Sequence, residues 1–137
     1  MDDARSLCPP GRPSELFERA LTNTPESRGI VAFDGGGAAA GLVIFGLVAG
    51  AIDTGAIYWL AVRPDRRRRG IARALLGLAR SELEAEHARI AIAELPEEPG
   101  TAAMAKMLAA SGFEREGVVA DFYRDGVALT LWRRSLS

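Results

Sequence analysis

The chain has 137 residues, of which 48% are hydrophobic and 26% charged, and its formal net charge is −1. This size and composition are typical of one globular domain with its own core, and they exclude a disordered or fibrous chain. The near-zero charge argues against a broad basic surface for nucleic acid. With one cysteine and one histidine, Cys8 and His87, the chain lacks the residues for a disulfide framework or a common zinc site, so we expect no metal.

Neither a signal peptide nor a membrane span is expected. The first five residues lack an apolar segment, so a reducing cytoplasm is the simplest location. Residues 35–52 carry no charge, but six of them are glycine, which indicates a turn and a buried strand rather than a transmembrane helix.

Pro9, Pro10 and Pro13 predict an irregular lead-in over residues 1–13, followed by a single domain over residues 14–137. Ser14 is a good N-cap, so we expect the first helix to run from there to about residue 23. Apolar runs, turn residues and helical periodicity predict the elements that follow. In chain order these are strands 30–33, 42–48 and 56–62, helix 70–86, strand 90–93, loop 95–100, helix 101–110 and a hairpin of strands 118–123 and 127–132.

The turn between strand 56–62 and helix 70–86 carries the most informative pattern. A strand that turns sharply into a helix leaves backbone N–H groups unpaired, and together with the helix dipole they suit a phosphate. Gly70 and Ala72 are small where a phosphate would approach the backbone. Residues 63–73 hold six arginines and one aspartate, a local charge of +5, so the remaining residues sum to −6. The alternative is that these arginines form a solvated basic loop. The position of the segment between a buried strand and an amphipathic helix, however, favours a compact anion site.

Three motifs resemble the GCN5-related N-acetyltransferase (GNAT) family. The sequence Arg67-x-x-Gly70-x-Ala72 is similar to the acetyl-CoA signature of that family. The segment 108–113, with its Gly-Phe pair, resembles the second helix and following strand of that family, and the hairpin 121–126 is similar to that of many members. The resemblance covers about residues 30–134.

The resemblance implies an α/β fold with a mixed, mostly antiparallel sheet splayed into a V, flanked by helices, with acetyl-CoA as cosubstrate in the gap. The backbone of Leu60 and Val62 would hold the pantetheine arm, and the Val62 N–H would polarise the thioester carbonyl. The pyrophosphate would bind the segment formed by Arg67, Arg68, Arg69, Gly70, Ile71 and Ala72.

The sequence departs from the family pattern at the catalytic positions. Leu108 stands where many members have a tyrosine that protonates the leaving thiolate, and the frequent glutamate of the central strand is absent. Glu94 is the best remaining carboxylate to accept a proton through water, and Tyr58 and Tyr123 are the only tyrosines. The structural alternatives are that Tyr58 is a core aromatic residue and that Glu94 is a solvated charge at a strand end.

The first strand that most members have before the first helix is expected to be absent or irregular, which would expose a sheet edge to pairing in a homodimer. The resulting functional hypothesis is transfer of acetyl from acetyl-CoA to a primary amine of a small molecule or peptide. A catalytically weak or inactive acyl-CoA-binding sensor is the main alternative, and a nucleic-acid-binding protein is disfavoured by the acidic remainder of the chain. The loops expected to select the acceptor, 24–29 and 95–100, and the last hairpin include several acidic residues, which favours a cationic amine.

Overall fold

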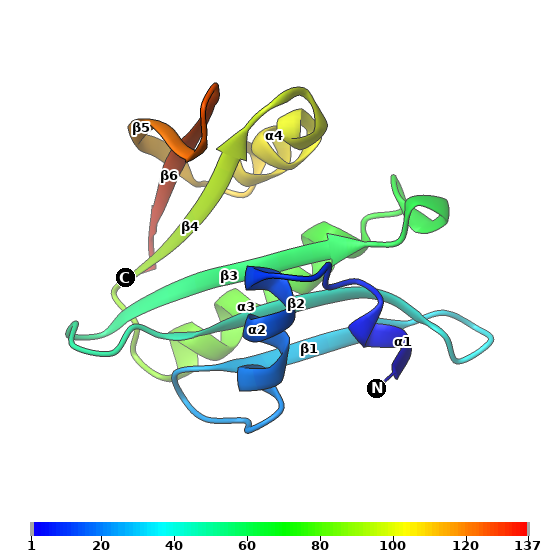
Figure 1. The fold of residues 1–137 in the computed structure, drawn as a ribbon. Coiled ribbons are helices and arrows are strands. Elements are labelled where there is room, and N and C mark those ends of the chain that lie inside the picture. The colour runs from blue at the N-terminus through cyan, green and yellow to red at the C-terminus, as the bar shows by residue number, and fades with distance from the viewer. Residues whose placement is uncertain (1, 137) are drawn as a thin grey trace.

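The computed structural model describes residues 2–136 and contains one mixed sheet of six strands in the order β1-β2-β3-β4-β6-β5 (Figure 1). Every neighbouring pair is antiparallel except β3 and β4, which are parallel. The strands are β1 Arg28–Phe33, β2 Ala39–Leu47, β3 Thr54–Val62, β4 Ile90–Glu97, β5 Glu114–Arg124 and β6 Val127–Ser135. The helices are α1 Asp2–Arg5, α2 Arg12–Ala20, α3 Ile71–Ala85 and α4 Ala102–Ala110, with short 3-10 turns at Pro64–Arg66 and Pro99–Thr101. The expected fold class is confirmed.

The sheet opens between its two central strands. Residues 54–57 of β3 pair with residues 90–93 of β4, and beyond these four pairs the strands separate, as Figure 1 shows. A parallel pair needs a crossover connection, which α3 supplies. After the separation, β4 stays paired with β6, and β3 stays paired with β2. One edge of β3 therefore leaves the ladder over residues 58–62.

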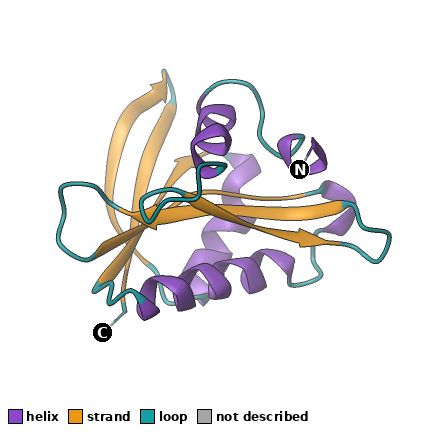
Figure 2. Cartoon of the chain, turned by 90° about the horizontal axis from the view of Figure 1, so that it is seen from below, coloured by secondary structure: helices purple, strands orange, loops and turns teal. Residues whose placement is uncertain are grey.

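Strand β2 is buried on both faces, which explains its continuous apolar run. Val43 and Phe45 pack with the apolar face of α3, while Leu42 and Ile44 pack with α1 and α2. Figure 2 shows these helices on opposite faces of the sheet. All four side chains are at most 2% exposed. Each such side chain contributes roughly 1.5–3 kcal/mol through burial. This packing fixes α2 and α3 on opposite faces of β1–β3.

The N-terminal segment is not the irregular lead-in that its prolines suggested. Residues Asp2–Arg5 form the short helix α1, and Leu7 and Cys8 are buried against the sheet. Helix α2 begins at Arg12 rather than after Ser14, with Gly11 as the N-cap residue. A proline in the first helical turn costs no hydrogen bond there, so Pro13 starts this helix instead of preventing it.

As expected, no strand precedes α2 within residues 2–136, and β1 forms one edge of the sheet. Dimer formation by pairing at this edge stays a prediction. Within the same residues no helix is long and apolar enough to cross a membrane.

Strand β4 is longer than predicted, because Ile90–Glu97 includes part of the expected loop 95–100. Pro96 lies within it, opposite Leu129 of β6. Proline is tolerated on a strand whose other edge is unpaired, because its missing N–H then removes no ladder hydrogen bond. The longer strand carries Glu94 and the residues after it along one side of the opening in the sheet.

Candidate active site

The turn that leads into α3 exposes a series of backbone N–H groups. Arg68 and Gly70 both have left-handed backbone angles, with φ of 65° and 78°. Helix α3 begins at Ile71 with no side-chain cap and no acidic residue in its first turn. The N–H groups of residues 70–73 therefore lack intrahelical acceptors. Alternating backbone geometry followed by a helix start forms a concave anion site made of main chain.

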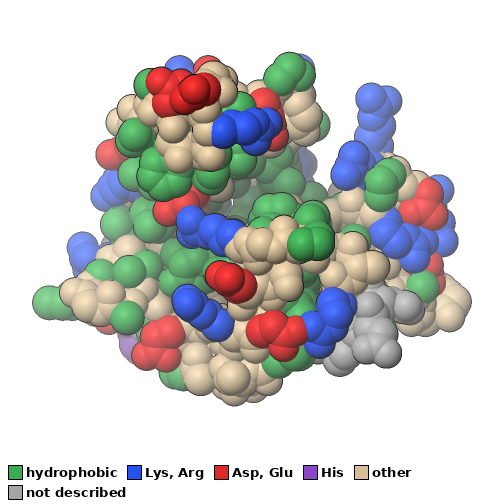
Figure 3. All heavy atoms as spheres, in the orientation of Figure 1, with side chains coloured by type: hydrophobic (Ala, Val, Ile, Leu, Met, Phe, Trp, Pro, Cys, Tyr) green, Lys and Arg blue, Asp and Glu red, His purple; other side chains and the backbone are tan. Residues whose placement is uncertain are grey.

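The arginines around this turn fall into two sets. Arg63 and Arg66 are held by Asp34, at N–O distances of 3.3 and 3.1 Å, and Arg63 also pairs with Asp65. By contrast, the structure gives no carboxylate partner within residues 2–136 to the second set, Arg67, Arg68, Arg69 and Arg73. The basic side chains gather at the end of the molecule where β3 turns into α3 (Figure 3). Their positive charge remains available to an anion.

Asp34 is itself fixed by hydrogen bonds, and these organise the first set of arginines. The Ala38 N–H, the Arg66 guanidinium and the Gly36 N–H all donate to its carboxylate and hold the pKa of Asp34 below its ordinary value. The charge of Arg66 is thus used structurally, to tie the β1–β2 turn to the start of the anion site.

The free edge of β3 presents main-chain groups to the opening in the sheet. The Arg63 N–H donates to Ala40 of β2 at 2.8 Å, so it points away from the opening. Successive residues of a strand point their N–H groups to opposite edges, and the register is unbroken from Trp59 to Val62. The N–H groups of Val62 and Leu60 therefore face the side that β4 has left. The Arg67 side chain, which donates to the Val62 carbonyl at 3.3 Å, reaches the same edge.

A β-bulge in β3 sets the direction of Tyr58. Ile44 pairs with Trp59 and the next residue of β2 pairs with Ile57, so Tyr58 has no cross-strand partner. Adjacent strand residues normally point to opposite faces, yet Tyr58 and Trp59 both pack with the α1–α2 layer. The Trp59 indole donates to the Leu7 carbonyl at 3.1 Å and is structural. Tyr58 instead lines a pocket.

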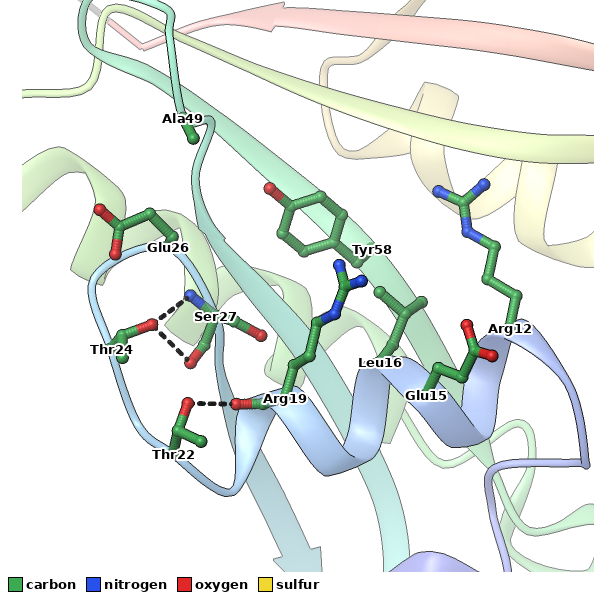
Figure 4. A pocket seen from close by; sticks show the side chains of 10 residues that line it. All are labelled: Arg12, Glu15, Leu16, Arg19, Thr22, Thr24, Glu26, Ser27, Ala49 and Tyr58. Carbon is green, nitrogen blue, oxygen red and sulfur yellow. Dashed lines mark hydrogen bonds between the residues drawn. The ribbon is translucent and has the colours of Figure 1, made fainter.

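That pocket has a volume of about 560 Å³ and lies beneath α2 (Figure 4). Arg12, Leu16 and Arg19 enter it from one face of the helix, and Tyr58 forms its floor on β3. Arg12 also forms an ion pair with Glu94 of β4, at 3.4 Å. The pocket and the opening in the sheet therefore share Arg12.

Of the three predicted catalytic residues, Glu94 acts through its charge on both of the others, Tyr58 and Tyr123. Burial raises the pKa of Tyr58, and the charges of Glu26 and Glu94 add to this. Burial and Glu94 also raise the pKa of Tyr123 on β5, while Arg12 lowers the pKa of both tyrosines. Both phenols are protonated at neutral pH and can act as proton donors.

The structural alternatives for these residues find partial support. Glu94 is exposed but paired with Arg12, and Tyr58 is half-buried at the pocket. Leu108 is 3% exposed within the core, so it supplies no polar group to the site.

Arg12 and Arg19 were missed by sequence reasoning, although their seven-residue spacing places them on one face of a helix. In the part of the chain described, no three His, Cys, Asp or Glu residues gather to hold a metal ion.

Solved structures similar to this chain are acetyltransferases of one fold. A protein assigned to the GNAT family from Desulfovibrio desulfuricans has 26% sequence identity and a TM-score of 0.81, over 91% of this chain and 79% of that one. Nourseothricin acetyltransferase has 26% identity and a TM-score of 0.70, over 82% and 67%. A protein described as a streptothricin acetyltransferase from Bacillus anthracis, solved with acetyl coenzyme A, has 16% identity and a TM-score of 0.73, over 82% and 64%. At that identity it shows the fold alone.

None of the curated proteins matches this sequence. The model of the acetyltransferase (GNAT) family, however, matches residues 1–113, which is most of the chain. Together with the opened sheet and the uncapped start of α3, this match assigns the family. The chain belongs to the GNAT family of acetyltransferases, which use acetyl-CoA.

Proposed function

We propose that this protein is an acetyl-CoA-dependent N-acetyltransferase that transfers acetyl to a primary amine by direct attack on the thioester. The observation that carries the proposal is the meeting of two features at the opening in the sheet. One is the unpaired edge of β3, and the other is the group formed by Glu94, Tyr58, Tyr123 and Arg12. The first suits an extended acyl-CoA arm and the second suits proton transfer.

The residues available for acetyl-CoA suit its pyrophosphate and its pantetheine arm. The pyrophosphate would bind the segment formed by Arg67, Arg68, Arg69, Gly70, Ile71 and Ala72, with the N–H groups at the start of α3 as donors and the unpaired arginines adding charge. The pantetheine amides would pair with the backbone of Leu60 and Val62. The Val62 N–H, which faces the opening in the sheet, would then stabilise the oxyanion of the attacked carbonyl.

Acetyl transfer then needs only a positioned amine and two proton movements. The amine nitrogen bonds to the thioester carbonyl carbon, the C–S bond breaks, and the products are an amide and CoA. The proton lost by the amine passes through water to Glu94, and the CoA sulfur takes a proton from Tyr58 or Tyr123. These tyrosines would replace the donor that Leu108 cannot supply.

Glu94→Gln tests the catalytic half of this proposal against Glu97→Gln. Both glutamates lie on β4 and both pair with an arginine, Glu94 at 3.4 Å and Glu97 at 3.3 Å. We expect the Glu94 variant to lose about 100-fold in kcat, measured as thiol release over a panel of amines, with acetyl-CoA affinity unchanged. The Glu97 variant should keep its kcat. Equal rates in both variants would contradict the role of Glu94.

The buried Leu108 favours one alternative, a module that binds acyl-CoA without turnover. Calorimetry with acetyl-CoA and thiol release separate the two functions. Binding together with amine-dependent thiol release supports the enzyme, binding with no release from any amine supports the sensor, and absence of binding removes both.

A further inference from the structure

The pocket beneath α2 contains charges of both signs, which bears on the acceptor. Arg12 and Arg19 enter it from α2, and Glu15 and Glu26 also line it (Figure 4). A pocket lined only by carboxylates would suit a plain cationic amine, as the acidic loops had suggested. This pocket instead offers partners for an ammonium group and for a carboxylate.

The two arginines differ in their partners. Arg12 pairs with Glu94, next to the opening in the sheet. Arg19 lies seven residues further along α2, a rise of about 10 Å. No carboxylate within the described residues pairs with Arg19, and its guanidinium points toward Tyr58 inside the pocket (Figure 4). Arg19 is therefore the cation in this pocket that is open to a ligand.

Tyr58 connects the two ends of the pocket. Tyr58 lines the pocket together with both arginines, and Figure 4 shows its ring between Glu26 on one side and Arg12 on the other. Arg12 pairs with Glu94 at 3.4 Å, so the Arg12 side of the ring is the side next to the proton-transfer group. A molecule bound along this ring would place one end near Arg19 and the other near Glu94.

We propose that the acceptor is a small amino carboxylate, whose carboxylate binds Arg19 and whose amine lies at the Arg12 end of the pocket, next to Glu94. This inference rests on the proposed function and adds the substrate class to it. Guanidinium and carboxylate form charge-assisted, bidentate hydrogen bonds, which makes Arg19 the specificity-determining residue. Glu15 and Glu26 disfavour dicarboxylates by repulsion, and Arg19 disfavours simple diamines in the same way.

Matched acceptors test the proposal. We would compare 4-aminobutyrate with its carboxamide, and extend the acids to glycine and 6-aminohexanoate to measure the span of the pocket. The wild type should prefer the acid over its amide by about tenfold or more in kcat/KM. Arg19→Gln should abolish this preference mainly through KM, and Arg19→Glu should reverse it. Arg133→Gln, which removes the same charge from β6 outside the pocket, should leave the preference intact.

Calorimetry of the CoA-loaded protein supplies a readout that does not depend on turnover. The acid should bind at least about tenfold more tightly than the amide, and Arg19→Gln should remove the difference. Equal use of acid and amide, or failure of every acid to bind, overturns the inference while acetyl-CoA binding and amine acetylation can stand. Failure to bind acetyl-CoA overturns the proposed function itself, and the two failures are thereby distinguished.

Discussion

The turn before α3 and the pocket beneath α2 are built in opposite ways. The turn is made of main chain from one continuous segment, residues 67–73, in which Gly70 and the uncapped helix start present the N–H groups. The pocket is made of side chains from separate segments, including Arg19 on α2, Glu26 in a loop and Tyr58 on β3. Backbone groups survive most substitutions, while each pocket side chain can be changed alone. One fold can therefore keep its acyl donor and vary its acceptor.

The largest expected effect comes from a substitution that disrupts the pocket and leaves the turn before α3 intact. A Cβ on Gly46 of β2 would collide with the backbone of Pro25 and Glu26, at the base of the loop that lines the pocket. The Leu47 N–H also holds this loop through the Pro25 carbonyl at 2.8 Å. We expect Gly46→Ala to cost about 3 kcal/mol of unfolding free energy. In the folded fraction the acceptor KM should rise while acetyl-CoA affinity is kept.

Gly117→Ala is the matched control, because a Cβ there meets no atom within 4 Å. Denaturant unfolding measures the stability of both variants, and calorimetry measures their acetyl-CoA affinity. If Gly46→Ala weakened acetyl-CoA binding as much as acceptor use, the two regions would not be independent.

The second largest effect comes from a substitution that disrupts the turn before α3 and leaves the pocket intact. Arg67 reaches the free edge of β3 through the Val62 carbonyl and has no carboxylate partner in the described structure. Arg67→Glu replaces an attractive charge with a repulsive one, so we expect acetyl-CoA affinity to fall by about 30-fold, measured by calorimetry. Stability should hardly change. An unchanged affinity would place the phosphates elsewhere.

The same contrast explains what the sequence could predict. The order of the strands and of α2, α3 and α4 follows from local periodicity, and so does the turn, because Gly70 and its neighbouring arginines are contiguous. The pocket depends on tertiary structure. Pro13 made the segment around Arg12 look irregular in the sequence, and the bulge that directs Tyr58 adds one residue to a strand without a sequence signal. Arg19 can be recognised as a pocket residue only once the position of α2 on the sheet is known.

The third prediction compares the effects of alanine at two glycines, Gly70 just before α3 and Gly77 inside it. Gly70 has φ of 78°, whereas Gly77 lies in the helix, where an added Cβ would meet no atom within 4 Å. Gly70→Ala should lose about 1 kcal/mol of unfolding free energy through left-handed strain, and acetyl-CoA affinity should fall as the turn shifts. Gly77→Ala should gain about 0.5–1 kcal/mol from helix propensity. Thermal unfolding that moves both variants in the same direction would contradict this assignment.

The smallest expected effect concerns Asp34, which pairs with Arg63 and Arg66 and so neutralises their charge next to the anion site. Hydrogen bonds from the Ala38 N–H, the Arg66 guanidinium and the Gly36 N–H lower the pKa of Asp34 from its ordinary value of 3.8. Because the folded-state pKa is the lower one, the ionised carboxylate stabilises the fold fully above about pH 3.8, and this contribution is lost as the pH falls further. Asp34→Asn should be less stable at neutral pH and should lose less stability on acidification.

Melting temperatures of the wild type and Asp34→Asn, measured from pH 7 to pH 3, should therefore converge at the acid end. Asparagine keeps an oxygen that can accept from the Gly36 and Ala38 N–H groups, so the β1–β2 turn should persist and the change should isolate the charge. Parallel curves would mean that Asp34 stabilises the turn through shape alone. Converging curves would mean that the anion site is built with an internal counter-charge, which organises Arg63 and Arg66 while leaving the arginines after them free.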